Sequence, residues 1–362
     1  MILIIGGGIL GLAAAELLSR DHKVALVNDE NLPAGSKAAA ANLCTKGQLF
    51  ARDFHFDLKL KSKKIYLDWV QSFCSIPVES IYKSGIGIDF FASEELRDAQ
   101  LKRVLQPKNE LLARNLQIDS IVSSNNFGHP AILYQDEAWV NAELLMLELR
   151  KTLISRGVSL VSATIGHEYT LKNVISDFAG VKKIIIAAGA WSPQILKDAN
   201  IALPQEFLSG VRLSAGSTFR VRGNLLTPKS GNFSVVEMLS EKAEKYTLSG
   251  NLEDSFLSST SLRFENSLNA ESWADQLSKK NEQFLANFTN SPLKNSTFEC
   301  EHQRQEFQIK SGLRIGFGHS EIVVRRLEKN WNGVCVDVCA GAHRSGFLFA
   351  PYVGHLLQNL QS

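Results

Sequence analysis

The chain has 362 residues, 44% of them hydrophobic, which is enough for a large core and more than one compact unit. Lysine and arginine number 39 against 37 acidic residues, and a net charge of +2 gives no reason to expect nucleic acid as a partner. The five scattered cysteines do not form a disulfide or zinc pattern, and no apolar run approaches the roughly 18 residues of a membrane helix. The first apolar run leads into glycines rather than a cleavage site, so we expect a soluble cytoplasmic protein.

The N-terminal segment predicts a βαβ unit around a glycine turn. Residues 2–5 are all apolar, residues 9–19 favour a helix, and residues 23–27 are typical of a second strand. Gly6-x-Gly8-x-x-Gly11 lies between the first strand and the helix, the context that this motif requires. The three glycines allow a tight turn, close approach of a pyrophosphate, and close packing of helix on strand, and the helix start offers N–H donors. The pattern predicts a dinucleotide site at Gly6, Gly8, Ile9 and Gly11.

The residue that would bind the ribose is open between two candidates. The second strand ends in Asn28, Asp29 and Glu30, and the fingerprint expects an acid at this point. Asn28 lies nearest to the expected position and can bond a hydroxyl without a charge, while Asp29 follows it. The plainer alternative is that Asp29 and Glu30 are ordinary loop acids.

The rest of the chain shows helical and strand patterns that alternate at first and then change. Residues 33–48 are typical of a loop and the start of a helix, the lysine-rich residues 59–64 of a solvated face, and residues 66–73 of the end of a helix. Further helices are predicted at 141–156, 272–288 and 346–360. Strands are predicted at 158–161, 181–187, 217–221, 233–237 and 246–249, with a hairpin at Asn332-Gly333 between 322–327 and 334–338.

These patterns predict an α/β protein with a discontinuous Rossmann-like domain. We expect the dinucleotide-binding domain to comprise residues 1–80, 141–204 and 316–362. An inserted α+β domain with an antiparallel sheet, for the substrate, would comprise residues 81–140 and 205–315.

Several segments carry a resemblance to a known family. AAGAWS (187–192), GLR (312–314), GAHRSGFLFAP (341–351) and SKAAAANL (36–43) occur with the N-terminal IIGGGILGL in the family's order. Together they resemble the D-amino-acid oxidase and glycine oxidase family of FAD-dependent amine oxidases, over the whole chain. The resemblance implies an extended FAD with its adenine end at the glycine turn and Asn28 or Asp29. No histidine or cysteine argues for covalent attachment. The isoalloxazine would lie near Ser36, Lys37, Ala41, Asn42, Ala188, Gly189, Trp191, Gly341, Arg344, Ser345, Gly346 and Phe347.

The resemblance also implies roles for a few residues. Arg314 of the GLR motif matches the family's substrate-carboxylate arginine, since a planar guanidinium binds a carboxylate bidentately. Arg344 matches a second arginine near the flavin, while Tyr246 and His319 are further candidates and Lys46 is a candidate for promoting the oxygen reaction. The plainer alternatives are an ion pair for Arg314 and structural roles for the others. The stretch RIGFGHSE (314–321) departs from the family, which usually has proline and an acid there.

The implied function is oxidation of a small amine or amino acid of the glycine, sarcosine or D-amino-acid type. Hydride would pass from Cα to flavin N5, giving an imine, and oxygen would reoxidise the flavin to give hydrogen peroxide. One alternative is an FAD-dependent dehydrogenase of a hydroxy acid that uses another acceptor. The other is a flavoprotein that acts on a macromolecule, such as a modified tRNA base or a partner protein, and the near-neutral charge disfavours the tRNA version.

Overall fold

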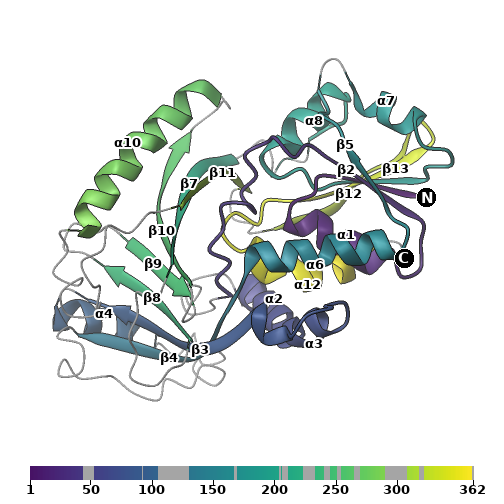
Figure 1. Cartoon of the computed structure of the whole chain (residues 1–362). Coiled ribbons are helices and arrows are strands. Elements are labelled where there is room, and N and C mark those ends of the chain that lie inside the picture. Colours follow the sequence, from purple (N-terminus) through teal and green to yellow (C-terminus); the bar gives the residue numbers. More distant parts are fainter. Residues whose placement is uncertain are drawn as a thin grey trace.

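The protein is built on two β-sheets that lie side by side, with helices packed around them (Figure 1). This computed structural model describes residues 1–43, 53–91, 93–104, 130–166, 169–203, 205, 211–222, 233–239, 245–250, 254–264, 270–289, 308–317 and 322–360. In this part of the chain, no helix is long and apolar enough to cross a membrane.

The smaller sheet has six strands in the order β12-β13-β6-β1-β2-β5. Its strands are β1 (Ile2–Ile5), β2 (Val24–Asn28), β5 (Ser159–Ser162), β6 (Lys183–Ile186), β12 (Val323–Trp331) and β13 (Val334–Ala340). All neighbours are parallel except β12 and β13, which form a hairpin. Because successive side chains of a strand point to opposite faces, Ile2 and Ile4 join one hydrophobic cluster while Leu3 and Ile5 join another.

Helices cover both faces of the smaller sheet. The first cluster is completed by α1 (Ile9–Leu18), α6 (Ala142–Ser155) and α12 (Gly346–Asn359), which lie below the sheet in Figure 1. The second cluster includes α7 (Leu171–Ser176) and α8 (Ser192–Asp198), which lie above it. This is a doubly wound arrangement, in which ligands bind at the carboxyl ends of the parallel strands.

The larger sheet has seven strands in the order β11-β7-β10-β9-β8-β3-β4. They are β3 (Tyr82–Phe90), β4 (Ala131–Val140), β7 (Val211–Arg222), β8 (Phe233–Leu239), β9 (Lys245–Gly250), β10 (Asp254–Phe264) and β11 (Gln308–Phe317). Neighbours are antiparallel except β3 and β8. The long helix α10 (Ala270–Thr289) packs on one face, where Phe284 stacks on Phe219 of β7, and α4 (Glu94–Val104) lies by β4. We propose that the two domains follow these two sheets.

The predicted fold class is confirmed, and several elements lie close to their predicted bounds. The βαβ unit, α6, α10, α12 and the hairpin are present, and Asn332 and Gly333 both have positive φ, of 50° and 80°, as a tight hairpin turn requires. Residues 66–73 were expected to end a helix, but Tyr66–Gln71 form a short separate helix, α3. The strands β3, β4, β10 and β11 were not predicted.

The prediction of a solvated lysine face at residues 59–64 is wrong for two of its lysines. Helix α2 (Asp53–Lys64) packs against α12, and Lys59 and Lys63 are buried there while Lys61 and Lys64 are exposed. The Lys59 ammonium lies 5.8 Å from the centroid of the Phe349 ring. Long lysine stems can cover apolar surface in this way, so a run of lysines does not by itself mean exposure.

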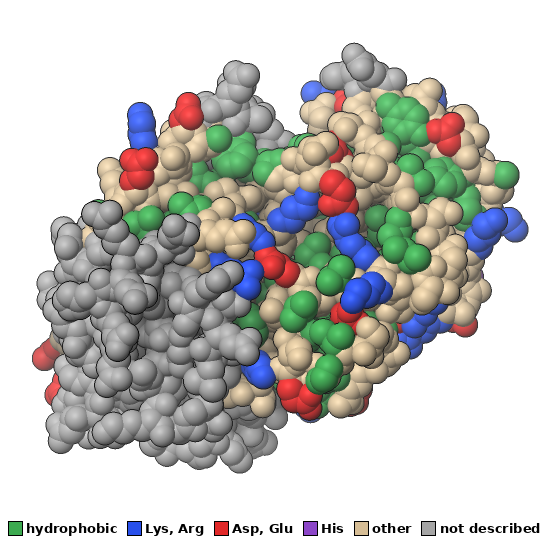
Figure 2. All heavy atoms as spheres, in the orientation of Figure 1, with side chains coloured by type: hydrophobic (Ala, Val, Ile, Leu, Met, Phe, Trp, Pro, Cys, Tyr) green, Lys and Arg blue, Asp and Glu red, His purple; other side chains and the backbone are tan. Residues whose placement is uncertain are grey.

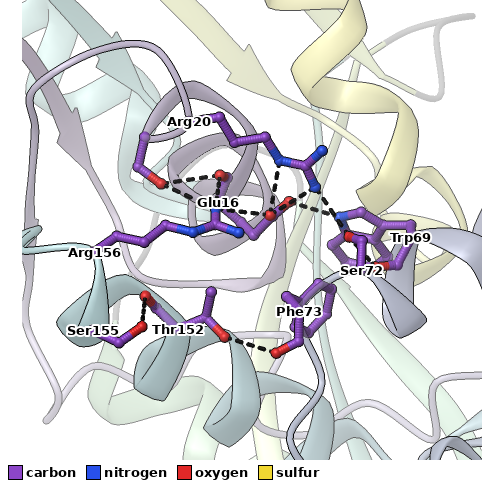
Figure 3. A network of polar contacts seen from close by, with 9 residues as sticks. Glu16, Arg20, Trp69, Ser72, Phe73, Thr152, Ser155 and Arg156 are labelled. Carbon is purple, nitrogen blue, oxygen red and sulfur yellow. Dashed lines mark hydrogen bonds and ion pairs between the residues drawn. The ribbon is translucent and has the colours of Figure 1, made fainter.

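A buried carboxylate joins three helical segments below the smaller sheet (Figure 3). Glu16 of α1 is fully buried, and its Oε1 accepts hydrogen bonds from Arg20 Nη2 at 2.8 Å and Arg156 Nη1 at 2.9 Å. Its Oε2 accepts one from Trp69 Nε1 of α3 at 3.0 Å. Arg20 also donates to Ser72, so one carboxylate connects α1, α3 and the end of α6.

Candidate active site

A cavity of about 740 Å³ lies where the two sheets meet, and most of the predicted site residues line it. It is bounded by the glycine turn, by loops after β2 and β6, by β11 and by the start of α12. Its lining includes Gly6, Gly8, Ile9, Asn28, Asp29, Ser36, Ala41, Asn42, Ala188, Gly189, Trp191, Arg314, Gly341, Arg344, Ser345, Gly346 and Phe347. The chain therefore brings together residues that are more than 300 positions apart in sequence.

The glycine turn needs bare backbone at both of its ends. Gly6 has a φ of 111°, and a Cβ there would lie 2.4 Å from the carbonyl oxygen of Ala187. Gly11 does not line the cavity, and a Cβ on it would lie 1.9 Å from the carbonyl oxygen of Gly6. These contacts match the roles that the motif assigns to its first and third glycines, the tight turn and close helix packing.

Asn28 and Asp29, the two ribose candidates, both line the cavity and both have partners in the protein. Asn28 Oδ1 accepts a hydrogen bond from the Gly7 amide at 2.7 Å, and its Nδ2 donates to Glu30 Oε1 at 2.9 Å. An aspartate at position 28 could still accept the hydrogen bond from Gly7, but it would have no N–H to donate to Glu30. The side-chain amide of Asn28 therefore connects the glycine turn to the loop after β2. Asp29 accepts from the Asn31 amide at 2.8 Å and from the Thr164 hydroxyl.

Lys37 lies apart from the other predicted residues. It lines a second cavity of about 520 Å³ and pairs with Glu30, whose carboxylate is also 2.7 Å from Arg150 Nη1. Burial would raise the pKa of Glu30, but the hydrogen bond and charge of Arg150 outweigh it and hold the pKa below its usual value. Figure 2 shows cationic and anionic side chains side by side along the junction of the two halves. The described residues that line this second cavity carry both signs of charge, with Lys37, Arg150, Arg220 and Lys310 against Glu30 and Glu143.

Two helix starts face the main cavity. Helix α1 follows Gly8, which has no capping side chain, and helix α12 follows Ser345, whose side chain does not cap it either. Ser36 Oγ accepts from the Ile9 amide at 3.0 Å. Helix N-termini carry partial positive charge and favour anions. The α1 start therefore fits a pyrophosphate, and the α12 start fits an electron-rich ring edge such as the flavin N1–C2=O.

Arg314 lies on β11 with its guanidinium over the neighbouring strand. A Cβ on Gly216 of β7 would lie 2.5 Å from Arg314 Nη2, and one on Gly35 would lie 3.3 Å from Arg314 Cγ. The side chain keeps accessible surface because it lines the cavity, yet burial, followed by the charge of Arg344, lowers its pKa to about 10. It therefore stays charged at neutral pH. Within the described part of the chain it has no carboxylate partner, so the ion-pair alternative has no support there.

Both edges of β11 are held by main-chain hydrogen bonds. One edge pairs with β7 from Gln308 to Phe317. On the other edge, Leu313 N donates to Pro33 O at 2.8 Å, and His343 N donates to Ile315 O at 3.0 Å. The loop after β2 and the loop before α12, which both line the cavity, are thus bonded directly to the strand that carries Arg314.

His343 was not singled out from the sequence, although it precedes Arg344 in the quoted GAHR stretch. It has a φ of 45°, and its Nε2 lies 3.1 Å from Ser214 Oγ of β7. Burial, and then the charges of Arg344, Arg314, Arg212 and Arg263, lower its pKa to about 3. The imidazole is therefore neutral at physiological pH.

Two further cations line the cavity without having been predicted, Arg263 of β10 and Lys280 of α10. Their strand and helix lie in the region where sequence patterns are weakest, and an isolated basic residue gives no signal there.

Three predicted residues fall wholly or partly outside the described part of the chain. Tyr246 lies on β9, two strands from β7, but its side chain is not described. His319 and Lys46 lie entirely outside the described residues. Among the described residues, no group of histidine, cysteine and acidic side chains could hold a metal ion.

A glycine turn at a helix start, a second helix start and a charged arginine around one cavity are the features of a dinucleotide-dependent enzyme. The model of the FAD dependent oxidoreductase family, DAO, matches residues 1–360, and the chain belongs to this family. The protein is therefore an FAD-dependent oxidoreductase, and the cavity residues above fit its cofactor. No curated protein matches the chain by sequence.

Solved structures share the fold at low sequence identity. Iminodiacetate oxidase from Chelativorans sp. BNC1 is 18% identical with a TM-score of 0.73, covering 100% of this chain and 95% of its own. Glycine oxidase from Geobacillus kaustophilus is 18% identical with a TM-score of 0.67, covering 99% and 93%. L-α-Glycerophosphate oxidase from Mycoplasma pneumoniae, solved with FAD bound, is 16% identical with a TM-score of 0.66, covering 99% and 94%.

Proposed function

We propose that the protein oxidises a small amine or amino acid, of the glycine, sarcosine or D-amino-acid type, to an imine, with oxygen as the acceptor and hydrogen peroxide as the second product. The observation that carries this proposal is Arg314, a charged guanidinium that lines the cavity and has no carboxylate partner among the described residues. A substrate carboxylate would satisfy it bidentately. The similar folds of a glycine oxidase and an iminodiacetate oxidase support an amine as the substrate.

The chain's own residues would bind and orient the substrate. FAD, when bound, supplies the acceptor for a hydride. Arg314 would fix the carboxylate so that the adjacent C–H bond has one direction, and orientation of this kind contributes much of the rate in such reactions. Arg344 lines the same cavity and would assist with the carboxylate. The amine must be neutral when the C–H bond breaks, because its lone pair stabilises the developing imine.

Among the described residues, no strong base lines the proposed substrate end of the cavity, which suits this chemistry. Asp29 is the one carboxylate among the described lining residues, and it lies at the ribose end after β2. His343 is neutral but shares its Nε2 with Ser214. A hydride transfer from a neutral amine needs no side chain to remove a proton from carbon, so the absence of a carboxylate there is expected.

An Arg314→Met variant tests the proposal. We expect kcat/KM for the best amine substrate to fall roughly 100-fold or more, because two charge-assisted hydrogen bonds are lost. Substrates are found by anaerobic bleaching of the flavin with glycine, sarcosine and D- and L-amino acids, and turnover is followed with an oxygen electrode. Arg97→Met, at an arginine of α4 that is paired with Asp98 and does not line the cavity, is the matched control and should leave kcat/KM unchanged.

Two outcomes would contradict the proposal. If Arg314→Met keeps the wild-type kcat/KM, the carboxylate is not bound there. If no amine bleaches the flavin while a hydroxy acid or its phosphate does, the protein belongs with the hydroxy-compound oxidoreductases, a class for which the glycerophosphate oxidase shows the same fold.

A further inference from the structure

Two arginines flank one serine in a row across the larger sheet. In the registers of β10, β7 and β11, Arg263 pairs with Ser214, and Ser214 pairs with Arg314. Directly paired residues of antiparallel strands point to the same face, so both arginines lie on the face that carries Ser214. Since neighbouring strands are about 4.8 Å apart, the two Cα atoms are roughly 10 Å apart. Both side chains line the main cavity.

The opposite face of the same strands is apolar, which fixes the orientation of the row. Leu262, next to Arg263, is buried in the hydrophobic cluster with Ala215 and Ile315, the neighbours of Ser214 and Arg314. Trp273 and Leu277 of α10 belong to this cluster as well. One face of the three strands therefore packs into the core, and the other presents the arginines to the cavity.

Among the described residues that line the cavity, the positive charge exceeds what one carboxylate would neutralise. Four cations line the cavity in the described part of the chain, Arg263, Lys280, Arg314 and Arg344, against the single acid Asp29. The phosphates of a dinucleotide belong at the glycine turn, away from the larger sheet. The low pKa of His343, to which burial contributes most and Arg263 and Arg314 also contribute, agrees with an excess of positive charge around Ser214.

We propose that the substrate carries two anionic groups, with the first bound at Arg314 and the second at Arg263. This rests on the proposed function, because Arg314 is taken to hold the carboxylate next to the reacting C–H bond. Arg263 is exposed and has no acidic partner among the described residues, so its guanidinium can bind an incoming carboxylate or phosphate bidentately. The neutral His343 with Ser214 lies between the two arginines and adds no third charge.

Three inert acids of equal length test this inference on the FAD-loaded enzyme. Succinate has a second carboxylate, 3-phosphonopropionate has a phosphonate at the same place, and butyrate has a methyl group. Each Kd is measured by titration of the flavin absorption spectrum, so that no turnover is required. We expect succinate or 3-phosphonopropionate to bind at least 10-fold more tightly than butyrate, and the tighter of the two shows whether the second group is a carboxylate or a phosphate.

The variants assign the preference to its residue. In Arg263→Gln the two diacids should lose their advantage over butyrate, while the Kd of butyrate stays within about twofold of wild type. Because Arg263 is exposed, this change should not disturb folding. Lys279→Gln, next to Lys280 on α10 but outside the cavity lining, controls for general charge and should preserve the preference.

Failure of the inference is distinguishable from failure of the proposed function. If butyrate binds as tightly as both diacids, or if the preference survives in Arg263→Gln, the second anionic site is wrong. If Arg314→Gln weakens none of the three acids, the carboxylate site itself is wrong, whatever their ratio. If Arg314→Gln weakens all three and Arg263→Gln affects only the diacids, both proposals hold.

Discussion

At the scale of single residues, the position of Arg314 depends on what its neighbours lack. Its guanidinium occupies the space where a Cβ of Gly216 would be, 2.5 Å from Nη2. The distance is below any that real Cβ atoms show, and the atom in the way is the functional end of the arginine. The glycine on β7 is therefore part of the proposed carboxylate site, although it carries no functional group.

We expect Gly216→Ala to displace the Arg314 guanidinium and weaken binding of butyrate and of substrates, by about 10-fold or more. The fold should survive, because a flexible side chain can move aside more easily than backbone. The measurement is the Kd from flavin absorption, with thermal unfolding as the check on folding. Gly166→Ala is the matched control, since a Cβ there meets nothing within 4 Å. Unchanged binding in Gly216→Ala would mean that the guanidinium is not needed at this position.

His343 makes stability depend on pH at the same site. Its pKa is about 3 in the folded protein, because burial and then the surrounding arginines disfavour the imidazolium, against about 6.5 in an unfolded chain. Above pH 6.5 both states are neutral at this residue and no stability is lost. Below it, the unfolded chain binds a proton that the folded chain does not, so stability falls by up to about 1.4 kcal/mol per pH unit as pH drops toward 3.

His343→Gln should remove this part of the acid sensitivity. Between pH 6.5 and pH 5.0 the wild type should lose about 1.6 kcal/mol more free energy of unfolding than the variant does, measured by urea denaturation. His22→Gln, at an exposed surface position, should follow the wild type. An equal loss in wild type and His343→Gln would show that this imidazole is not held neutral by its surroundings.

At the scale of elements, α1 is the helix on which the dinucleotide turn depends, and Glu16 fixes its far end. The carboxylate is fully buried, while Arg20 and Arg156 reach solvent with 39% and 27% of their side-chain surface. Removal of a buried partner leaves the Trp69 N–H without its acceptor and both guanidiniums without their counter-charge.

Glu16→Ala should therefore lower the free energy of unfolding by roughly 2–3 kcal/mol, measured in urea. The comparison variant is Glu94→Ala, because Glu94 is exposed and lies 3.9 Å from Arg97 in a surface ion pair, and it should cause no measurable loss. A Glu16→Ala protein as stable as the wild type would mean that the helices hold α1 in place by apolar packing alone.

The elements also differ in how well the sequence predicts them. The central strands β1, β2 and β6 of the smaller sheet are short and mostly apolar, as in Ile2–Ile5 and Lys183–Ile186, so their pattern is clear. Strand β10 reads DSFLSSTSLRF, where serines replace the alternation of apolar and polar residues, and β3 contains Gly85 and Gly87. Such strands are defined by their neighbours in the sheet, which a local pattern does not contain.

At the scale of the whole molecule, the cofactor side of the cavity was predictable and the substrate side was largely not. The glycine turn and the GAHRSGF stretch are recognisable in the sequence, and each contributes several neighbouring residues to the cavity lining through its backbone conformation. Arg263 and Lys280 reach the cavity only through the register of β10 with β7 and the placement of α10. That register depends on pairing between segments that are distant in sequence, so no local spacing of residues predicts it.

Strand β11 has a consequence for how this enzyme can diversify. Because its two edges are bonded to β7 and to both loops that border the cofactor end, Arg314 stays aligned with that end whatever happens elsewhere in the larger sheet. In the part of the chain that the structure describes, β10 and α10 have no such main-chain bonds to the loops at Pro33 and His343. With Arg314 as the proposed carboxylate site, exchange of Arg263 or Lys280 can change which substrates fit while the proposed anchor keeps its position beside the cofactor end. Because Arg314 stays in place while Arg263 and Lys280 can be replaced, a few substitutions would be enough to change substrate specificity.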